Sequence, residues 1–480
     1  IATSDRDPGL ILSPRHFLTS NRGLILFGVA WGAALFHAVM PTVAGFVTLR
    51  SLVLVMMTML IITIMRSDKR ILIISPLLVL SVLALVGYSF VEALFAQFPD
   101  YFSYEKKPDP RTLSYPGSLG ESLVLQFIAF CLLLTAIIFR LAPDGAPKWD
   151  DPSLRHPMVV VTAVAALAIV ASVVVDISVA SNPALKGFLT TGIGKQFADS
   201  GDPITALSFA VLAYGAGTRG RVLTALFFSL AIIYLMVKSS IGLVQMPIAI
   251  VVVAVTFYLL IGKKNPYVIG LAACVILAFA LIIVFGIAHT RYKTDLGPTA
   301  SVFKTIKFVL SYKVILRQGQ SAYCFNTIVS GHRPAPNSEK PFYFLSAVVP
   351  RFIYKDKPNL SRGHEFVTKY CGDTSTLNKQ HYELVTILAE PVLEGGFTGL
   401  AAVQLFLGVS LTFVTLVMLR GGPITVITIV ALLPWLTHFQ QSFALYFANS
   451  VKMYFYMLPA IALLWWWMRR QGPVKPESSL

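Results

Sequence analysis

Long apolar segments separated by short charged ones make up most of the chain. A helix crosses a bilayer with about 17 to 25 predominantly apolar residues, and about twelve segments meet this requirement. The pattern therefore predicts an all-α polytopic membrane protein with about twelve transmembrane helices. The sixth and seventh segments are short, so a merged or re-entrant segment is an alternative there. The predicted spans are residues 23–40, 44–65, 71–98, 121–139, 157–179, 203–217, 222–237, 242–261, 265–288, 396–418, 423–438 and 451–467.

The composition indicates the same class of protein. Hydrophobic residues make up 56% of the 480 positions and charged residues 13%, and the mean hydropathy is +0.72. These values lie well outside those of a soluble globular domain. The net charge of +16 does not indicate a nucleic-acid partner, because Lys and Arg lie between apolar segments and do not form one contiguous solvated patch.

The distribution of Lys and Arg predicts the orientation of the spans, since short cytoplasmic connectors are enriched in these residues. With a cytoplasmic N-terminus, strict alternation gives every short inside connector at least one Lys or Arg and leaves residues 99–120, 180–202 and 289–395 as the longer outside connectors. We therefore expect both termini in the cytoplasm and one large outside loop between the ninth and tenth spans. The basic residues of the inside connectors and the tail are Arg66, Lys69, Arg70, Arg140, Lys148, Arg155, Arg219, Arg221, Lys263, Lys264, Arg420, Arg469, Arg470 and Lys475.

The large loop divides the chain into an N-terminal bundle (1–288), the loop itself (289–395) and a C-terminal membrane segment with its tail (396–480). The densest mixture of basic, acidic and His side chains lies in residues 350–400. Charged groups at membrane depth are tolerated where they line a water-filled cavity, and not against lipid. We therefore interpret this stretch as an active-site loop at the membrane surface.

A proline-bracketed basic turn opens this stretch. Pro350 and Pro358 enclose Arg351, Lys355 and Lys357, and the prolines stiffen a turn that presents several cations in one direction. Such a turn suits a diphosphate, because Arg can clamp two oxygens and Lys adds a point charge. A turn that contacts lipid head groups in general explains the same charges, and the residues alone leave both interpretations open.

Six His and Glu residues further along are candidates for a general base. A neutral imidazole or an ionised carboxylate can remove a proton from a sugar hydroxyl near neutral pH. If residues 382–393 are helical, the last three of the glutamates fall near one face. The residues alone do not decide which of the six acts. The six are His364, Glu365, His381, Glu383, Glu390 and Glu394.

Charged residues within the spans form a second group of candidates. Arg50 lies inside the second span, where an Arg is costly and usually partnered or functional. It can face a diphosphate or extend to the outer interface, and Asp176 in the fifth span is a candidate partner. We expect His37, in the first span, to be structural.

The cysteines suggest one disulfide. Cys324 and Cys371 both fall in the outside loop, where an oxidising compartment allows a pair to bridge. The sequence does not show that the two approach each other, so the pairing stays open. Cys131 and Cys274 lie in predicted spans, where a small apolar side chain is the simpler explanation.

Residues 350–400 resemble the signature of the Wzy-type O-antigen and exopolysaccharide polymerases. The similarity rests on the run PRFIYKDKP, on Gly363 and Phe366 after it, and on an acidic helix that continues into GGFTGL. The many spans with one large late loop are similar as well. His381 with Leu384 also resembles the His-x-x-Leu element of the related O-antigen ligases.

This resemblance implies a metal-independent, GT-C-like glycosyltransferase of the bacterial inner membrane, without a cofactor. It implies undecaprenyl-diphosphate-linked oligosaccharides as donor and acceptor on the periplasmic face, with a chain-length regulator and a flippase as further partners. His381 would deprotonate the acceptor hydroxyl, with Glu383 as its orienting partner or substitute. The residues implied to bind the departing diphosphate are Arg351, Lys357, Arg362 and Arg50.

Three other classes of protein are alternatives. An O-antigen ligase would use the same donor and transfer the polymer to a lipid A core. A transporter of lipid-linked glycans is less consistent with the sequence, which has no repeated halves and gathers its charges in one loop. A dolichol-type enzyme with an acidic metal site fits poorly, because the first outer connector, around Pro41, contains no Asp or Glu and no set of residues has metal-ligand spacing.

Overall fold

The computed structural model describes residues 21–40, 42–67, 69–86, 119–142, 157–190, 192–241, 245–262, 325–330, 348–349, 354, 387–439 and 441–470. All of the regular elements in these ranges are helices. They are α2 (Asn21–Val39), α3 (Val43–Arg66), the 3-10 helix η1 (Arg70–Ile74), α4 (Pro76–Ala84), α7 (Leu119–Leu141), α8 (Pro157–Ser181), α9 (Pro183–Thr190), α10 (Gly192–Arg219), α11 (Arg221–Ile241), α12 (Gln245–Ile261), α19 (Ala389–Arg420), α20 (Pro423–Leu436) and α21 (Phe443–Arg470).

Six helices of the described part are long and apolar enough to cross a membrane. These are the apolar parts of α3, α7, α8, α11, α19 and α21. α2, α12 and α20 are also apolar, but their apolar parts are shorter. The predicted class, a helical polytopic membrane protein, is therefore confirmed. The count of twelve spans stays a prediction, because span 265–288 and parts of others lie outside the described residues.

The outward faces of several helices are apolar, as contact with lipid requires. On α8, Val160, Val164, Leu167 and Val174 are each about half exposed or more and recur at helical spacing along one face. α19 shows the same pattern at residues 405, 409 and 413. Exposed apolar surface of this extent is unusual on a soluble protein but normal against hydrocarbon.

Consecutive helices run in opposite directions between two ends of the bundle. At one end Arg140 on α7 donates from Nη1 to Asn21 Oδ1 at the start of α2 (2.7 Å). Lys69, just after α3, donates from Nζ to the carbonyl of Phe139 (3.0 Å) at the end of α7. At the other end, His37 near the end of α2 bonds through Nδ1 to Ser122 Oγ at the start of α7 (2.9 Å).

The acidic residues and the arginines at helix termini lie at different ends of the bundle. We call the first the arginine end, because helices begin or finish there at Arg66, Arg219, Arg221, Arg420 and Arg470, and Arg140 lies in the last turn of α7. We call the second the acidic end, because all of the acidic residues in the described part of the chain lie in the helix portions near it. These residues are Glu121, Asp176, Asp199, Asp202, Glu390 and Glu394.

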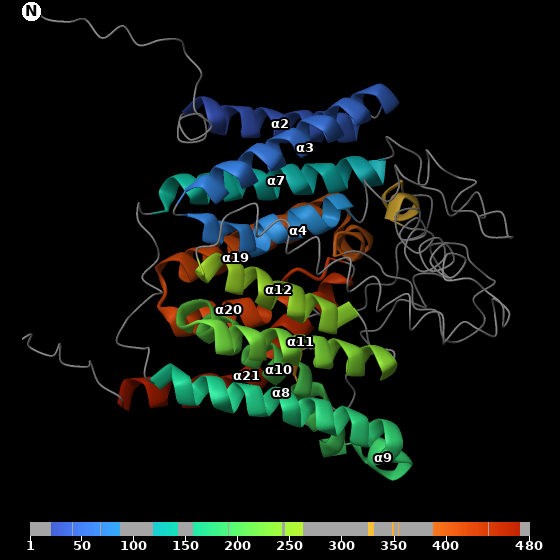
Figure 1. Ribbon diagram of the computed structural model, residues 1–480. Helices are drawn as coiled ribbons and strands as arrows, with labels where there is room; N and C mark the ends of the chain where they lie inside the picture. The colour runs from blue at the N-terminus through green and yellow to red at the C-terminus, as the bar shows by residue number, and fades with distance from the viewer. Residues whose placement is uncertain are drawn as a thin grey trace, which may run out of the picture.

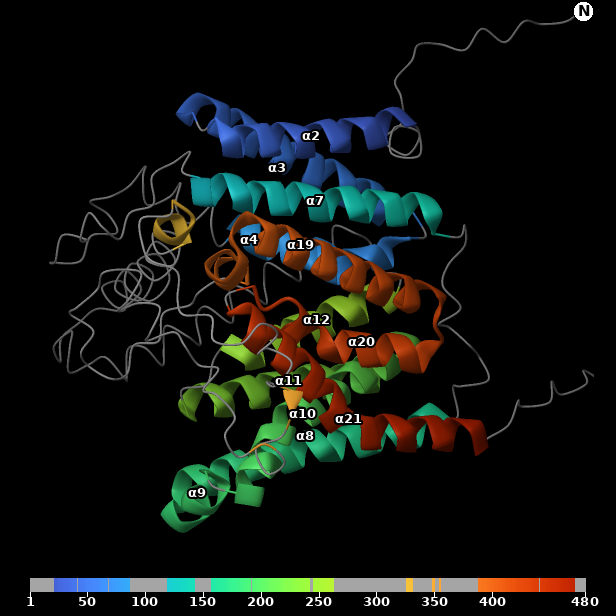
Figure 2. The same cartoon turned by 180° about the vertical axis from the view of Figure 1, so that it is seen from behind.

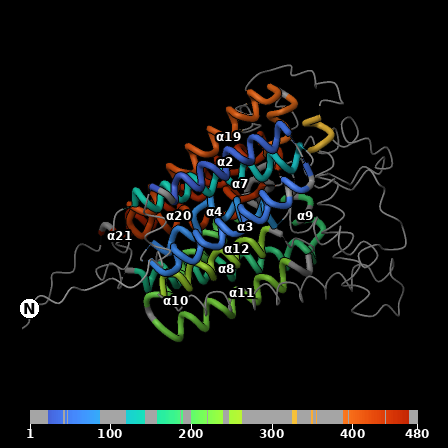
Figure 3. The backbone as a smooth tube through the Cα atoms, turned by 90° about the horizontal axis from the view of Figure 1, so that it is seen from above, coloured from blue at the N-terminus to red at the C-terminus, as the bar shows by residue number. Residues whose placement is uncertain are grey.

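The C-terminal helices join two groups of helices (Figures 1 and 2). α2, α3, α4 and α7 pack together near one edge of the bundle, and α8, α10, α11 and α12 form the rest. α19 contacts α4 and α7, whereas α20 contacts α10 and α12. Viewed from above, the long helices follow a shared direction (Figure 3). α19 therefore bridges the two groups through its contacts with α4, α7 and α20, with one apolar face directed outward.

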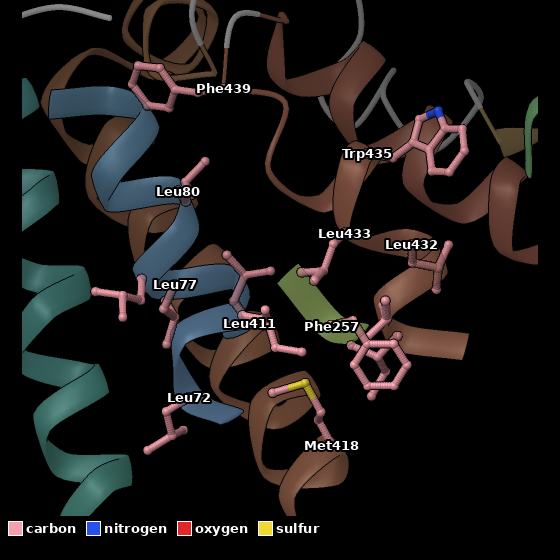
Figure 4. Packing of buried hydrophobic residues seen from close by; sticks show 14 of the residues in the cluster. Leu72, Leu77, Leu80, Phe257, Leu411, Met418, Leu432, Leu433, Trp435 and Phe439 are labelled. Carbon is pink, nitrogen blue, oxygen red and sulfur yellow. The ribbon is translucent and has the colours of Figure 1, made fainter. Parts of the chain in front are cut away.

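A close-packed apolar core lies where α4, α12, α19 and α20 meet (Figure 4). Leu77, Phe257, Leu411 and Leu433 come from these four helices and are each at most 2% exposed. Lipid is as apolar as Leu, so this packing stabilises the bundle through van der Waals contact and much less through removal from water. Cys131 is also buried and carries a free thiol, as its position in a span predicts.

Two predicted segments differ from the structure. The span 71–98 does not begin as one helix, because η1 ends at Ile74 and α4 starts with Pro76 at its first position, where the missing N–H is not needed. The connector 180–202 contains helix, namely α9 and the first part of α10. These residues include many polar positions, so a search for apolar runs does not detect their helices.

α19 is kinked near its beginning. Gly396 has φ 59° and ψ −148°, a conformation that residues with a Cβ rarely adopt, and it interrupts the helix between Ala389 and Arg420. A Cβ on Gly399 would lie 2.5 Å from the carbonyl oxygen of Pro391, so the two parts of α19 approach closely. The kink connects the end of the large loop to the membrane-crossing part of α19.

We expect Gly396→Ala to lower the free energy of unfolding by about 1–3 kcal/mol, because Ala would be forced into this strained conformation. Gly395→Ala is the matched control, since its Cβ would meet nothing within 4 Å and its backbone φ is not positive. Unfolding of the purified protein in detergent, followed by circular dichroism, compares the two. Equal stability of both variants would show that the kink does not depend on glycine.

Candidate functional site at the acidic end

The large loop contacts the bundle at the acidic end through residues 325–330. Phe325, Ile328 and Val329 are buried. Gly120, at the start of α7, donates its N–H to Asn326 Oδ1 at 3.3 Å. A Cβ on Gly120 would lie 3.1 Å from Asn326 Cα, so only a small residue allows this approach. This part of the loop is therefore packed on the first turn of α7.

The end of the loop is fixed at the same end of the bundle. Ile387, Leu388 and Ala389 are fully buried. The N–H of Ile387 donates to the carbonyl of Phe439, in the connection between α20 and α21, at 3.2 Å. Phe439 stacks on Phe127 of α7 with ring centroids 6.0 Å apart. The residues that lead into α19 thus contact the α20–α21 connection, which in turn packs on α7.

Glu390 forms the polar part of this second anchor. It is 2% exposed, and its Oε2 accepts a hydrogen bond from the backbone N–H of Ala444 at 2.8 Å. Ala444 lies in the first turn of α21, where N–H groups lack helical acceptors and the helix dipole favours a negative charge. Glu390 therefore joins the start of α19 to the start of α21. This contact gives it a positioning role; whether it also acts as a base stays a prediction.

Glu390→Ala is expected to destabilise the protein by about 1–3 kcal/mol, because it leaves the buried N–H of Ala444 without its acceptor. Glu390→Gln keeps an oxygen acceptor of similar size, so we expect it to retain most of that stability. Thermal unfolding of both variants in detergent measures the difference. If the Ala variant unfolds at the wild-type temperature, Glu390 does not hold the two helices together.

A chain of polar side chains extends from the same connection. Gln441 Nε2 lies 2.7 Å from His438 Nδ1, and Asn449 Nδ2 donates to Gln441 Oε1 at 3.0 Å. The sequence prediction did not include these residues, and it placed His438 at the end of an apolar span. The polar run THFQQS at residues 437–442, between the last two predicted spans, was the signal that could have identified them.

Most of the predicted site residues lie outside the described residues, so their positions and roles stay predictions. Of the others, Arg50 lies on α3, nearer its acidic end, and is half-buried, and Glu394 lies in the first part of α19. Glu390 and Glu394 are thus both near the start of α19, at the acidic end. The site residues outside the described ranges are Arg351, Lys357, Arg362, His364, Glu365, His381 and Glu383, together with the cysteine pair Cys324 and Cys371.

His37 has the structural role that its sequence position suggested. It is 6% exposed, bonds Ser122 Oγ through Nδ1, and lies with Nε2 2.8 Å from the carbonyl oxygen of Thr42. Its ring therefore links α2, the start of α3 and α7. A Cβ on Gly45 would come within 3.0 Å of the ring, so a small residue is needed beside it.

Asp176 has a different partner from the one predicted. Its Oδ2 lies 2.9 Å from Nζ of Lys238, and the same Nζ lies 3.2 Å from Oδ1 of Asp202. The expected pairing of Asp176 with Arg50 is therefore wrong. The cause is that Lys238, near the end of α11, reaches the acidic end from a helix that packs against α8. We call Asp176, Asp202, Lys238 and the neighbouring Tyr234 the lysine cluster.

Within the described part of the chain, no three His, Cys, Asp or Glu side chains form a group that could hold a metal ion. The described side chains at the acidic end supply carboxylates, amides, the imidazoles of His37 and His438, and the cations of Arg50 and Lys238. The chain matches no protein-family model, no curated protein and no solved structure. A functional assignment therefore has to rest on the residues themselves.

Proposed function

We propose that this protein is a membrane glycosyltransferase that polymerises lipid-linked oligosaccharide repeat units on the outer face of a bacterial inner membrane. In this proposal the donor and the acceptor are both undecaprenyl-diphosphate-linked glycans. The growing glycan is transferred to the incoming unit, and undecaprenyl diphosphate is released. The chemistry takes place in residues 350–400 of the large loop.

The observation that supports this proposal most is the attachment of the loop to the acidic end at both 325–330 and 387–390. Short cytoplasmic connectors are enriched in Arg and Lys, so the arginine end is expected to face the cytoplasm. The acidic end, with the loop packed on it, would then face the periplasm. Lipid-linked glycans would reach the loop there from the outer leaflet.

The proposed residues have two roles in the transfer, which are stabilisation of the leaving diphosphate and deprotonation of the acceptor. Arg351, Lys357 and Arg362 would stabilise the negative charge that grows on the lipid diphosphate as the glycosidic bond breaks, with Arg50 as a further cation. His381 would remove the proton from the acceptor hydroxyl while that oxygen attacks the anomeric carbon of the donor. The bond between the anomeric carbon and the diphosphate oxygen breaks, the diphosphate departs with the bonding electron pair, and a glycosidic bond to the acceptor oxygen replaces it.

The number of repeat units attached to lipopolysaccharide in cells tests this function. Deleting the gene in a host that makes polymeric O-antigen should leave lipid A cores capped with a single repeat unit, because ligation continues without polymerisation. Re-expression should restore the ladder on a gel. Cores without any cap would instead assign the protein to the ligases, and an unchanged ladder would contradict both activities.

A further inference from the structure

The lysine cluster carries more negative than positive charge inside the bundle. Lys238 is 5% exposed and contacts both Asp176 of α8 and Asp202 of α10. One ammonium and two carboxylates leave a net charge of −1. The side chains of Asp176 and Asp202 are 21% and 38% exposed, so the excess negative charge lies at the partly exposed side of the cluster, where a further cation could neutralise it.

Tyr234 provides an independent sign of a missing ligand. It precedes Lys238 by one helical turn on α11, and its ring lies 5.7 Å from the ammonium nitrogen. The residue is fully buried, and its hydroxyl has no hydrogen-bond partner among the described residues. A buried hydroxyl in this state is unfavourable by itself, and the charges of Asp176 and Asp202 both act on it, so the phenol oxygen is a further candidate ligand of the cluster.

The backbone near Asp202 offers another oxygen. Pro203 lies inside α10 and has no N–H, so the carbonyl of Asp199 loses its normal helical donor. Asp202 itself is 38% exposed at its side chain, whereas Lys238 is 7% exposed. The Asp202 side of the cluster is therefore partly exposed, whereas Lys238 and Tyr234 are buried.

We propose that the lysine cluster binds one small monovalent cation, which is either an alkali-metal ion or a proton. Carboxylate, phenol and carbonyl oxygens are the ligand types that hard cations and protons prefer. The charged and titratable groups that act on one another at this position are Asp176, Asp202, Tyr234 and Lys238. Binding would neutralise the cluster and fix α8, α10 and α11 relative to one another.

The melting temperature of the full-length protein in detergent tests this site. It is measured at constant ionic strength in NaCl, in KCl and in N-methyl-D-glucamine chloride, whose cation is too large to enter. An alkali-metal site predicts a rise of about 2 °C or more in Na⁺ or K⁺, because a ligand that binds only the folded state stabilises it. A proton site predicts no salt preference and a rise in melting temperature as the pH falls.

Variants decide whether either response comes from the cluster. Asp202→Asn, at the half-exposed position, should abolish the response, since the remaining Asp176 and Lys238 are already neutral together. Tyr234→Phe removes only the hydroxyl, which has no described partner, and should weaken the response without lowering stability in N-methyl-D-glucamine. Lys452→Met is the control, because Lys452 stacks on Tyr456 of α21 and belongs to a different contact.

The outcomes separate the site from a purely structural ion pair. A cation or proton response that is lost in Asp202→Asn, weakened in Tyr234→Phe and kept in Lys452→Met supports the proposal. A response that is absent in the wild type, or equal in all variants, overturns it. The measurement does not depend on glycosyl transfer, so it stands or fails separately from the proposed function.

Discussion

Arg351→Lys should reduce the rate of polymer formation by about 10²–10³-fold, which is the typical effect of removing one group that stabilises charge in a transition state. Lys retains the positive charge but cannot form the two parallel hydrogen bonds that a guanidinium offers to a phosphate. The effect should fall mainly on turnover, because the diphosphate gains its charge as the glycosidic bond breaks. The initial rate of ladder formation in proteoliposomes measures it.

A matched control makes this result specific to Arg351. Lys369→Arg changes a basic residue elsewhere in the same loop and should leave the rate within a factor of about two, as expected for a residue outside the reaction. Both variants should insert into the membrane and unfold at the wild-type temperature. Full activity of Arg351→Lys would remove this residue from the proposed mechanism.

His381→Ala should still bind the lipid-linked donor but lose turnover by about 10²–10⁴-fold, which is the usual contribution of a positioned general base. Donor binding is measured with a labelled substrate on the purified protein, and turnover is measured by the same ladder assay. Normal donor binding with lost turnover would indicate that the base is missing, whereas loss of both would indicate a misfolded loop.

Glu383→Gln is the comparison for the His381 variant. If Glu383 only orients the imidazole, its loss should lower the rate less than the loss of His381 does. Retained turnover in His381→Ala would assign the base to one of the glutamates. Among these, Glu390 is constrained by its hydrogen bond to Ala444, so Glu383 and Glu394 would be tested first.

The sequence was a good guide to where helices lie and a poorer guide to their ends. Helices such as α7 and α8 follow long apolar runs, because burial in lipid makes hydrophobicity the dominant signal. Pro76 divided one predicted run, since proline favours the first position of a helix. α9 and the start of α10 lay in a predicted connector, because polar residues can be helical without any apolar run.

Side-chain partners were harder to predict because they depend on which helices pack together. Asp176 and Lys238 are 62 positions apart, and nothing in the local pattern of either indicates the other. Glu390 was recognised as a candidate acid or base, but its bond to Ala444, 54 positions later, requires knowing where α21 begins. The His438 group was missed because His438 was the last residue of a predicted span and its partners lie after that span, where the prediction assigned only a connector.

Reconstitution tests the proposed function most directly. The purified protein is placed in lipid vesicles with one synthetic undecaprenyl-diphosphate-linked repeat unit and EDTA, and the products are resolved by gel and mass spectrometry. We predict a ladder of products whose masses differ by one repeat unit, with release of undecaprenyl diphosphate. A folded, substrate-binding protein that yields no product longer than the starting unit would contradict the proposal, and adding a lipid A core acceptor to the same vesicles would then test ligation.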